Sequence, residues 1–144
     1  MEKLYQALDK QVANLSVFFV KLHHFHWFVT GRNFYALHEK FEEFYDEINE
    51  LYDEFAERML MIGGTPSSTL KDYLAKASIQ EATGKEKTED MIEAIRDDFV
   101  LLVKELKEAL QIAQEFDDEQ TADLIITTLS SFEKHIWMLN FTLR

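Results

Sequence analysis

The chain has 144 residues, of which 47% are hydrophobic, with four Gly, one Pro and no Cys. This length suits one domain with a substantial core, and the absence of Cys excludes disulfides and thiol chemistry. Such a composition fits a reducing cytosol, so we expect a cytoplasmic protein. The formal net charge of −12 repels phosphate backbones and favours cations as partners.

The N-terminal segment "MEKLYQALDK" has neither the apolar core of a signal peptide nor an Arg-rich transit pattern. The most apolar run, "VANLSVFFVKLHHFHWFV", is interrupted by Lys21 and three histidines, which an ordinary membrane span does not tolerate. We therefore expect no export and no membrane insertion.

The first predicted helix covers about residues 4–29. Its apolar positions recur in steps of three and four, as in an amphipathic helix: Leu4, Leu8, Val12, Leu15, Phe19 and Leu22. His26 continues this stripe and is therefore expected at the end of a buried face. "TGRN" then interrupts the pattern, with Gly31 suited to a C-terminal cap and Asn33 to the next N-cap.

The second predicted helix runs through residues 34–62, about 43 Å at 1.5 Å per residue, and stops at "GGTPSS". Residues 63–87 form a long connection with one short helical piece, "LKDYLAKA". Apolar periodicity returns over residues 92–113 and again from about residue 120 to 139. The prediction is one all-α domain over residues 1–144, a four-helix bundle of the ferritin-like kind with a long crossover between its second and third helices.

A second stripe lies beside the core stripe of the second helix: His38, Glu42, Tyr45, Asn49, Asp53 and Glu57. His38 with Glu42, and Asp53 with Glu57, have i, i+4 spacing, so each pair points from one face. Imidazole nitrogens and carboxylate oxygens suit iron, manganese or zinc. Taken singly, such residues are usually hydrogen-bonded histidines or solvated acids. Their combination with His26 favours a metal site.

A single chain is not expected to complete this site. His38 and Asp53 are about 22 Å apart along one rigid helix. The chain also contains no Glu-x-x-His motif, which the ordinary di-iron bundle uses on two of its helices. We therefore expect no di-iron site within one bundle.

Two copies of the helix could complete the site by crossing antiparallel about a two-fold axis midway along it. His38 would then face Glu57 of the second copy, and Glu42 would face Asp53, because the residue numbers of both pairs have the same sum. Each dimer would hold two mixed sites, one at each end of the crossing.

The segments "HHFHWFVTGRNFYALHEKF", "YDEFAERMLMIGG" and "EKHIWML" closely resemble the Dps-type mini-ferritins, the family of the DNA-binding protein from starved cells. The spacing of His26, His38, Asp53 and Glu57 matches that family's ferroxidase motif, and Glu42 matches its additional acidic ligand. The resemblance implies a hollow dodecamer that oxidises ferrous iron with hydrogen peroxide, or more slowly with oxygen. It also implies storage of ferric mineral and protection against oxidative stress.

By the same resemblance, His26 and His38 come from one subunit, and Asp53 and Glu57 come from its mate. Glu42 bridges or assists a second iron, so that each interface site holds two ions. A site with so few protein ligands leaves coordination positions open for peroxide and water. Two ferrous ions can then supply both electrons that peroxide needs without releasing a hydroxyl radical.

The family also keeps a tryptophan beside the site, and Trp27 matches it as a residue that intercepts stray oxidising equivalents. The alternative for Trp27 is a packing aromatic. We interpret His23 and His24 as packing or surface residues, and we assign no role to His135 or Trp137.

Acidic residues cluster in "EFDDEQTAD", at the start of the last predicted helix: Asp117, Asp118, Glu119 and Asp123. The resemblance implies that they line three-fold pores through which iron enters. Alternatively, they oppose the helix macrodipole.

Some Dps-type proteins bind DNA through a Lys-rich tail, whereas this chain has only "MEK" before its first helix and ends in "NFTLR". With the net charge of −12, we therefore expect no DNA binding at physiological salt. The alternatives to a ferroxidase are a DNA-protecting shell protein and a non-catalytic one.

Overall fold

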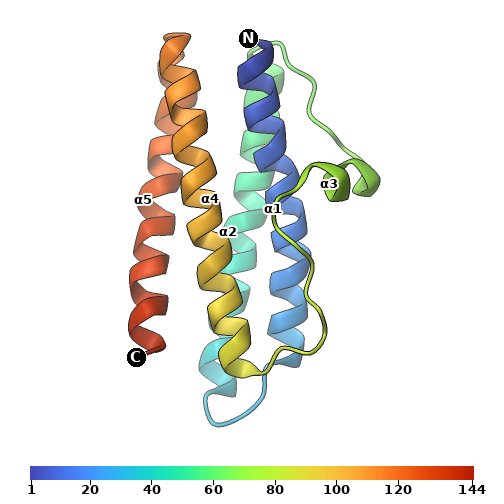
Figure 1. Ribbon diagram of the computed structural model, residues 1–144, viewed down its shortest axis with the longest axis vertical. Helices are drawn as coiled ribbons and strands as arrows, with labels where there is room; N and C mark the ends of the chain where they lie inside the picture. Colours follow the sequence, from blue (N-terminus) through green and yellow to red (C-terminus); the bar gives the residue numbers. More distant parts are fainter.

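The computed structural model describes residues 1–144, which fold into four long helices and one short helix (Figure 1). They are α1 (Glu2–Phe28), α2 (Phe34–Met61), α3 (Leu70–Lys76), α4 (Thr88–Glu115) and α5 (Glu119–Thr142). The all-α prediction is confirmed. None of these helices is both long enough and apolar enough to cross a membrane.

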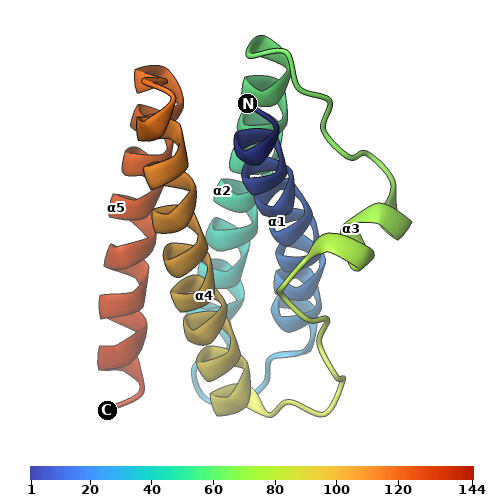
Figure 2. The same ribbon diagram turned by 45° about the horizontal axis from the view of Figure 1, so that its top comes forward.

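The four long helices pack side by side, and the two chain termini lie at opposite ends of the bundle (Figure 1). α1 and α2 form one antiparallel pair, and α4 and α5 form the other. Because α2 and α4 run in the same direction, the chain must return along the whole bundle between them. Residues 62–87 make this return, with α3 lying outside α1 (Figure 2). The predicted long crossover is therefore confirmed.

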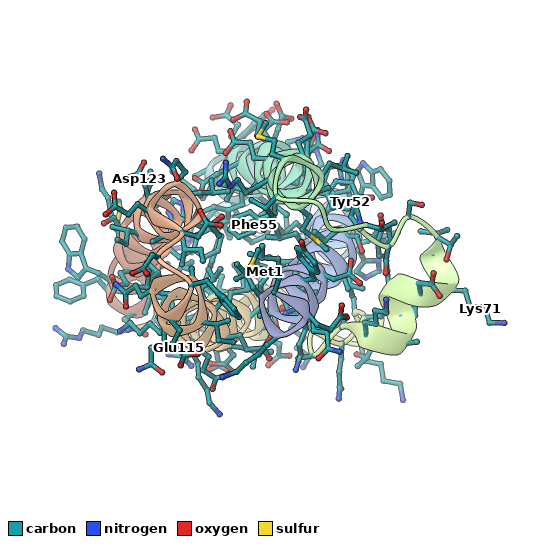
Figure 3. The ribbon with its side chains drawn as sticks, turned by 90° about the horizontal axis from the view of Figure 1, so that it is seen from above. Met1, Tyr52, Phe55, Lys71, Glu115 and Asp123 are labelled. Atoms are coloured by element: carbon teal, nitrogen blue, oxygen red, sulfur yellow. The ribbon has the colours of Figure 1, made fainter.

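The core is built from the apolar stripes of the four long helices. Viewed along the bundle, Phe55 points in among the helices, whereas Lys71 and Asp123 lie at the periphery (Figure 3). The largest fully buried side chains are aromatic: Phe18, Phe25, Phe41, Phe55, Phe99 and Phe132. His26 is only 6% exposed, so it ends the buried face of α1 as predicted.

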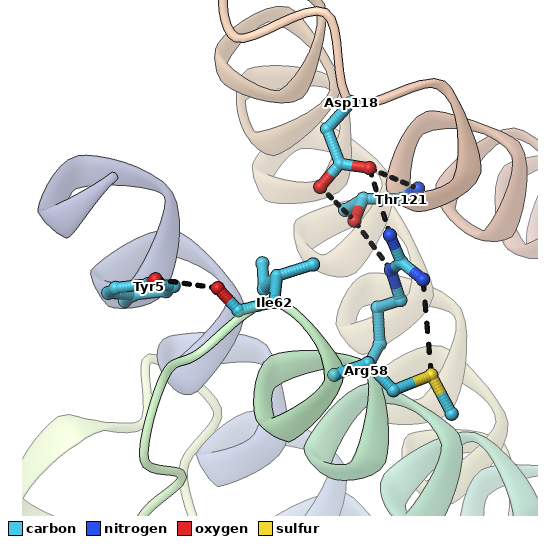
Figure 4. Close-up of polar contacts among 6 residues, drawn as sticks. Tyr5, Arg58, Ile62, Asp118 and Thr121 are labelled. Atoms are coloured by element: carbon cyan, nitrogen blue, oxygen red, sulfur yellow. Dashed lines mark hydrogen bonds and ion pairs between the residues drawn. The ribbon is translucent and has the colours of Figure 1, made fainter.

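Two glycines end α2 and pack against α1. Gly63 has φ of +95°, and the backbone N–H groups of Gly63 and Gly64 donate to the carbonyls of residues 60 and 59. This is a Schellman motif, which favours glycine at the left-handed position. A Cβ on Gly64 would lie 2.8 Å from the ring of Tyr5. The Tyr5 hydroxyl donates to the carbonyl of Ile62 over 2.7 Å, which fixes this corner to α1 (Figure 4).

The loop between α1 and α2 differs in detail from the prediction. α1 ends at Phe28, and Val29 is already extended. Gly31 has φ of +105° inside the loop, so the prediction that it caps α1 is wrong. Asn33 does occupy the N-cap position of α2, but its side chain makes no capping hydrogen bond.

Buried polar side chains of α1 hold the crossover in place. The Asp9 carboxylate accepts hydrogen bonds from the backbone and hydroxyl of Ser67, both at 2.7 Å, and from Lys76 Nζ at 2.8 Å. Burial favours a higher pKa for Asp9, but these hydrogen bonds outweigh it and hold the pKa below its ordinary value. Asn14 Oδ1 accepts from the backbone N–H groups of residues 78–79.

Candidate metal centre

Two imidazoles meet where α1 ends and α2 begins. His26 Nδ1 lies 2.7 Å from the carbonyl oxygen of His38, and His38 Nδ1 lies 2.8 Å from the carbonyl oxygen of His26. Because a carbonyl only accepts, both Nδ1 atoms must carry the proton and donate it. In the neutral rings, both Nε2 atoms then hold free lone pairs, which is the tautomer that a metal-binding histidine needs.

Other aromatic rings hold these imidazoles in place. The rings of His26 and His38 stack with centroids 3.7 Å apart and planes 16° apart. Phe34 stacks on His38 at 5.1 Å, and the edge of Tyr45 meets His26 at 5.2 Å. Neither imidazole is therefore free to rotate, and the direction of both Nε2 atoms is set before any metal binds.

Glu42 adds a carboxylate beside the imidazoles. Its Oε1 atom lies 3.8 Å from His26 Nε2, and its side chain is 53% exposed. A cation held by His26 would therefore have a negatively charged oxygen within reach. The role of His26, His38 and Glu42 as metal ligands stays a prediction.

Asp53 and Glu57 form a second group, one helical turn apart and farther along α2. Both side chains are exposed. A hydrogen bond with Asp53, and then the negative charge of Asp53, raise the pKa of Glu57 above its ordinary value. The two carboxylates thus lie close enough to repel one another, an arrangement that a bound cation would relieve.

The structure does not bring these two groups together within one chain. No three side chains of His, Asp or Glu in the chain are placed to hold one metal ion. The imidazole end and the carboxylate end of α2 remain about 22 Å apart, as the rise of a straight helix requires. Each end therefore carries only part of the predicted ligand set.

His23 is a packing residue, as predicted, but its packing partner Tyr45 was not predicted. Their rings stack with centroids 3.7 Å apart and planes 19° apart, and Tyr45 in turn touches His26. Trp27 lies 5.4 Å from His23, and its side chain is 65% exposed. The spacing of His23 three residues before His26, together with the place of Tyr45 on the ligand stripe, is the signal that could have revealed this.

Three other residues lie outside the group of rings around His26 and His38: His24, His135 and Trp137. His24 packs against Phe28 and borders a cavity of about 310 Å³ between α1 and α3. His135 joins α5 to α2 through Glu47, at 3.0 Å. Trp137 is exposed near the C-terminal end of α5.

The acidic cluster divides into structural and free carboxylates. Asp117 has φ of +54° in the turn that ends α4. Asp118 caps α5 by accepting from the backbone and hydroxyl of Thr121, and it pairs with Arg58 Nη2 at 3.0 Å (Figure 4). Asp117, Glu119 and Asp123 are exposed without such side-chain bonds, and they border an open hollow of about 380 Å³.

Comparison with known proteins identifies the family. Residues 5–144 match the ferritin-like domain. DNA protection during starvation protein 2 of Bacillus anthracis is 51% identical over 96% of this chain and 94% of its own length. A Dps protein from Bacillus brevis has a crystal structure with a TM-score of 0.98 and 50% identity, over 99% of this chain and 96% of that one. Dps from Listeria innocua, soaked with zinc, gives a TM-score of 0.94 at 41% identity, over 97% and 95%. The chain therefore belongs to the ferritin-like family and, within it, to the Dps proteins.

Proposed function

We propose that this protein is a ferroxidase whose site is completed by a second copy of the chain. The observation that carries the proposal is the pair of reciprocal hydrogen bonds between His26 and His38, which leaves two Nε2 lone pairs free and aimed. Asp53 and Glu57 supply the negative charge that ferrous iron requires, but they lie at the far end of the same helix.

An antiparallel crossing of two α2 helices would join these halves. His38 would then face Glu57 of the second chain, and Glu42 would face Asp53, because the helix positions are related by a two-fold axis. Two sites would form in each dimer. The exposure of Glu42, Asp53 and Glu57 in the single chain supports this arrangement, since their oxygens remain available to a partner.

The reaction is the oxidation of ferrous iron, which is the substrate. Two ferrous ions give two electrons to one molecule of hydrogen peroxide, and the products are two ferric ions and two hydroxide ions. His26 and His38 bind the first ion together with the second chain's carboxylates, and Glu42 assists the second ion. Because few protein ligands are used, positions stay open for the oxidant.

Storage follows from assembly of the dimers into a hollow dodecamer, in which ferric ions are retained as mineral. Glu119 and Asp123 would draw ferrous ions to the shell, because repeated copies of exposed acids focus cations. Trp27, joined to the site through Tyr45 and His23, would intercept an oxidising equivalent that escapes.

Anaerobic loading with ferrous iron, followed by titration with peroxide, tests the proposal. The ferric absorbance and the size of the protein are followed together. We expect oxidation with peroxide to be much faster than with air at matched oxidant, and to be lost when His26 and Asp53 are both changed to Ala. Equal rates for the wild type and that variant would reject the ferroxidase assignment.

A second candidate function is protection of DNA by direct binding, which the names of the Bacillus anthracis and Brevibacillus brevis relatives suggest. The net charge of −12 opposes it, because a duplex repels an acidic surface. Removal of ferrous iron and peroxide would protect DNA without contact. A gel-shift assay with duplex DNA at physiological salt decides between the two, and we expect no shifted band.

A further inference from the structure

The seam between α2 and α5 is joined by hydrogen bonds at only two places. At one end, Arg58 reaches Thr121 and Asp118, at 2.9 and 3.0 Å. In the middle, Glu47 receives hydrogen bonds from Ser131 at 2.9 Å and from His135 at 3.0 Å. The second group, Glu47 with Ser131 and His135, is called the seam triad here.

The residues of the seam triad are partly buried and packed against the core. The His135 side chain is 20% exposed, and its ring packs against Phe44 at 4.9 Å and Phe99 at 5.1 Å. Partial burial favours a higher pKa for Glu47, but the hydrogen bond and charge interaction with His135, together with Ser131, hold the pKa below its ordinary value. The carboxylate therefore stays ionised and strongly bound.

The position of Glu47 on α2 links the seam triad to the metal centre. Glu47 lies nearly midway between His38 and Glu57, on a side of the helix turned away from the ligand stripe. The two ligand groups sit at the two ends of this rigid rod. A shift or tilt of α2 at its middle would therefore move the ligands at both ends.

We propose that His135, through Glu47, is a positioning residue that sets α2 so that both half-sites meet their counterparts on a second chain. This rests on the proposed two-chain site. Ser131 contributes the second donor. Loss of the N–H at position 135 leaves the partly buried Glu47 carboxylate with one donor. The carboxylate then turns toward water, and the contact between α2 and α5 loosens.

The test compares zinc affinity among assembled proteins under anaerobic conditions, by calorimetry. His135→Leu keeps a side chain that can pack against Phe44 and Phe99 but removes the N–H, whereas His135→Gln keeps a side-chain N–H to donate to Glu47. Arg96→Gln is the matched control, because Arg96 donates to Asn140 over 3.0 Å between α4 and α5 and is 29% exposed. Ser131→Ala is a milder variant that tests the same point if His135→Leu does not fold.

We expect His135→Leu to weaken zinc binding by about tenfold, which corresponds to the loss of one hydrogen bond to a charged group. His135→Gln and Arg96→Gln should bind zinc as the wild type does, and Ser131→Ala should lie between. Wild-type affinity in folded His135→Leu, or in Ser131→Ala if His135→Leu does not fold, would overturn the positioning role.

A variant with His26 and Asp53 both changed to Ala distinguishes failure of the positioning role from failure of the two-chain site. If it loses zinc affinity while the seam variants keep theirs, only the positioning role is rejected. If its affinity is unchanged, the two-chain site is rejected, and the positioning role with it.

Discussion

Replacing Asp118 with Ala should lower the free energy of unfolding by about 2–4 kcal/mol. Loss of an N-cap carboxylate costs about 1 kcal/mol. Arg58 would lose its charged hydrogen bond while its side chain is only 19% exposed, and this adds about 1–3 kcal/mol. The assay is urea denaturation at a fixed protein concentration, because association also contributes to stability. A loss below about 0.5 kcal/mol, typical of a plain surface position, would refute the capping role.

Two exposed acids of the same cluster, Glu119 and Asp123, should affect iron uptake more than stability. Changing Glu119 to Gln and Asp123 to Asn together should lower stability by less than about 1 kcal/mol, because neither side chain has a hydrogen-bond partner and only Glu119 lies in the first turn of α5, where it opposes the helix macrodipole. This double variant should nevertheless take up ferrous iron more slowly, while preloaded iron reacts with peroxide at the wild-type rate. If uptake kept its rate, the pore role of both residues would be rejected.

Two further predictions concern inhibition and pH. Excess zinc should inhibit iron oxidation, because zinc outranks ferrous iron at nitrogen and oxygen ligands and cannot be oxidised; unchanged oxidation rates in zinc would contradict shared ligands. The pKa of Asp9 is lowered in the folded chain, so its contribution to stability is complete above the ordinary value of 3.8 and is lost as pH falls through the lowered pKa. Asp9→Asn should therefore be less stable than the wild type at pH 7, by urea denaturation, and its stability should change less on acidification; identical pH profiles would contradict this.

The long helices were predictable because their apolar positions repeat with a helical period, and these same positions form the core of the bundle. The ends were less so. Gly31 suggested a helix cap, yet Val29 leaves the helix first, and no periodicity specifies the path of a short loop. The long crossover was predictable from its composition, but not that Asp9 and Asn14 hold it against α1.

The residues of the candidate metal centre could be proposed from the sequence, but the contacts between their side chains could not. The spacing of His38, Asp53 and Glu57 identified the stripe on α2. The reciprocal bonds between His26 and His38 depend on how two helices approach, and the stacking of His23 on Tyr45 does too. Such contacts between helices leave no regular spacing in the sequence, so only the structure reveals them.

Mixing two inactive variants tests the two-chain site most directly. One variant has His26 and His38 changed to Ala, and the other has Asp53 and Glu57 changed to Ala. Each should be inactive alone, because every site lacks half its ligands. In a mixed dimer, one site loses all four ligands, but the other takes imidazoles from the second variant and carboxylates from the first and is complete. Co-expressed variants should therefore regain ferroxidase activity, up to one working site per mixed dimer. No recovery in a sample whose mixed dimers are confirmed by mass spectrometry would contradict a site shared between two chains.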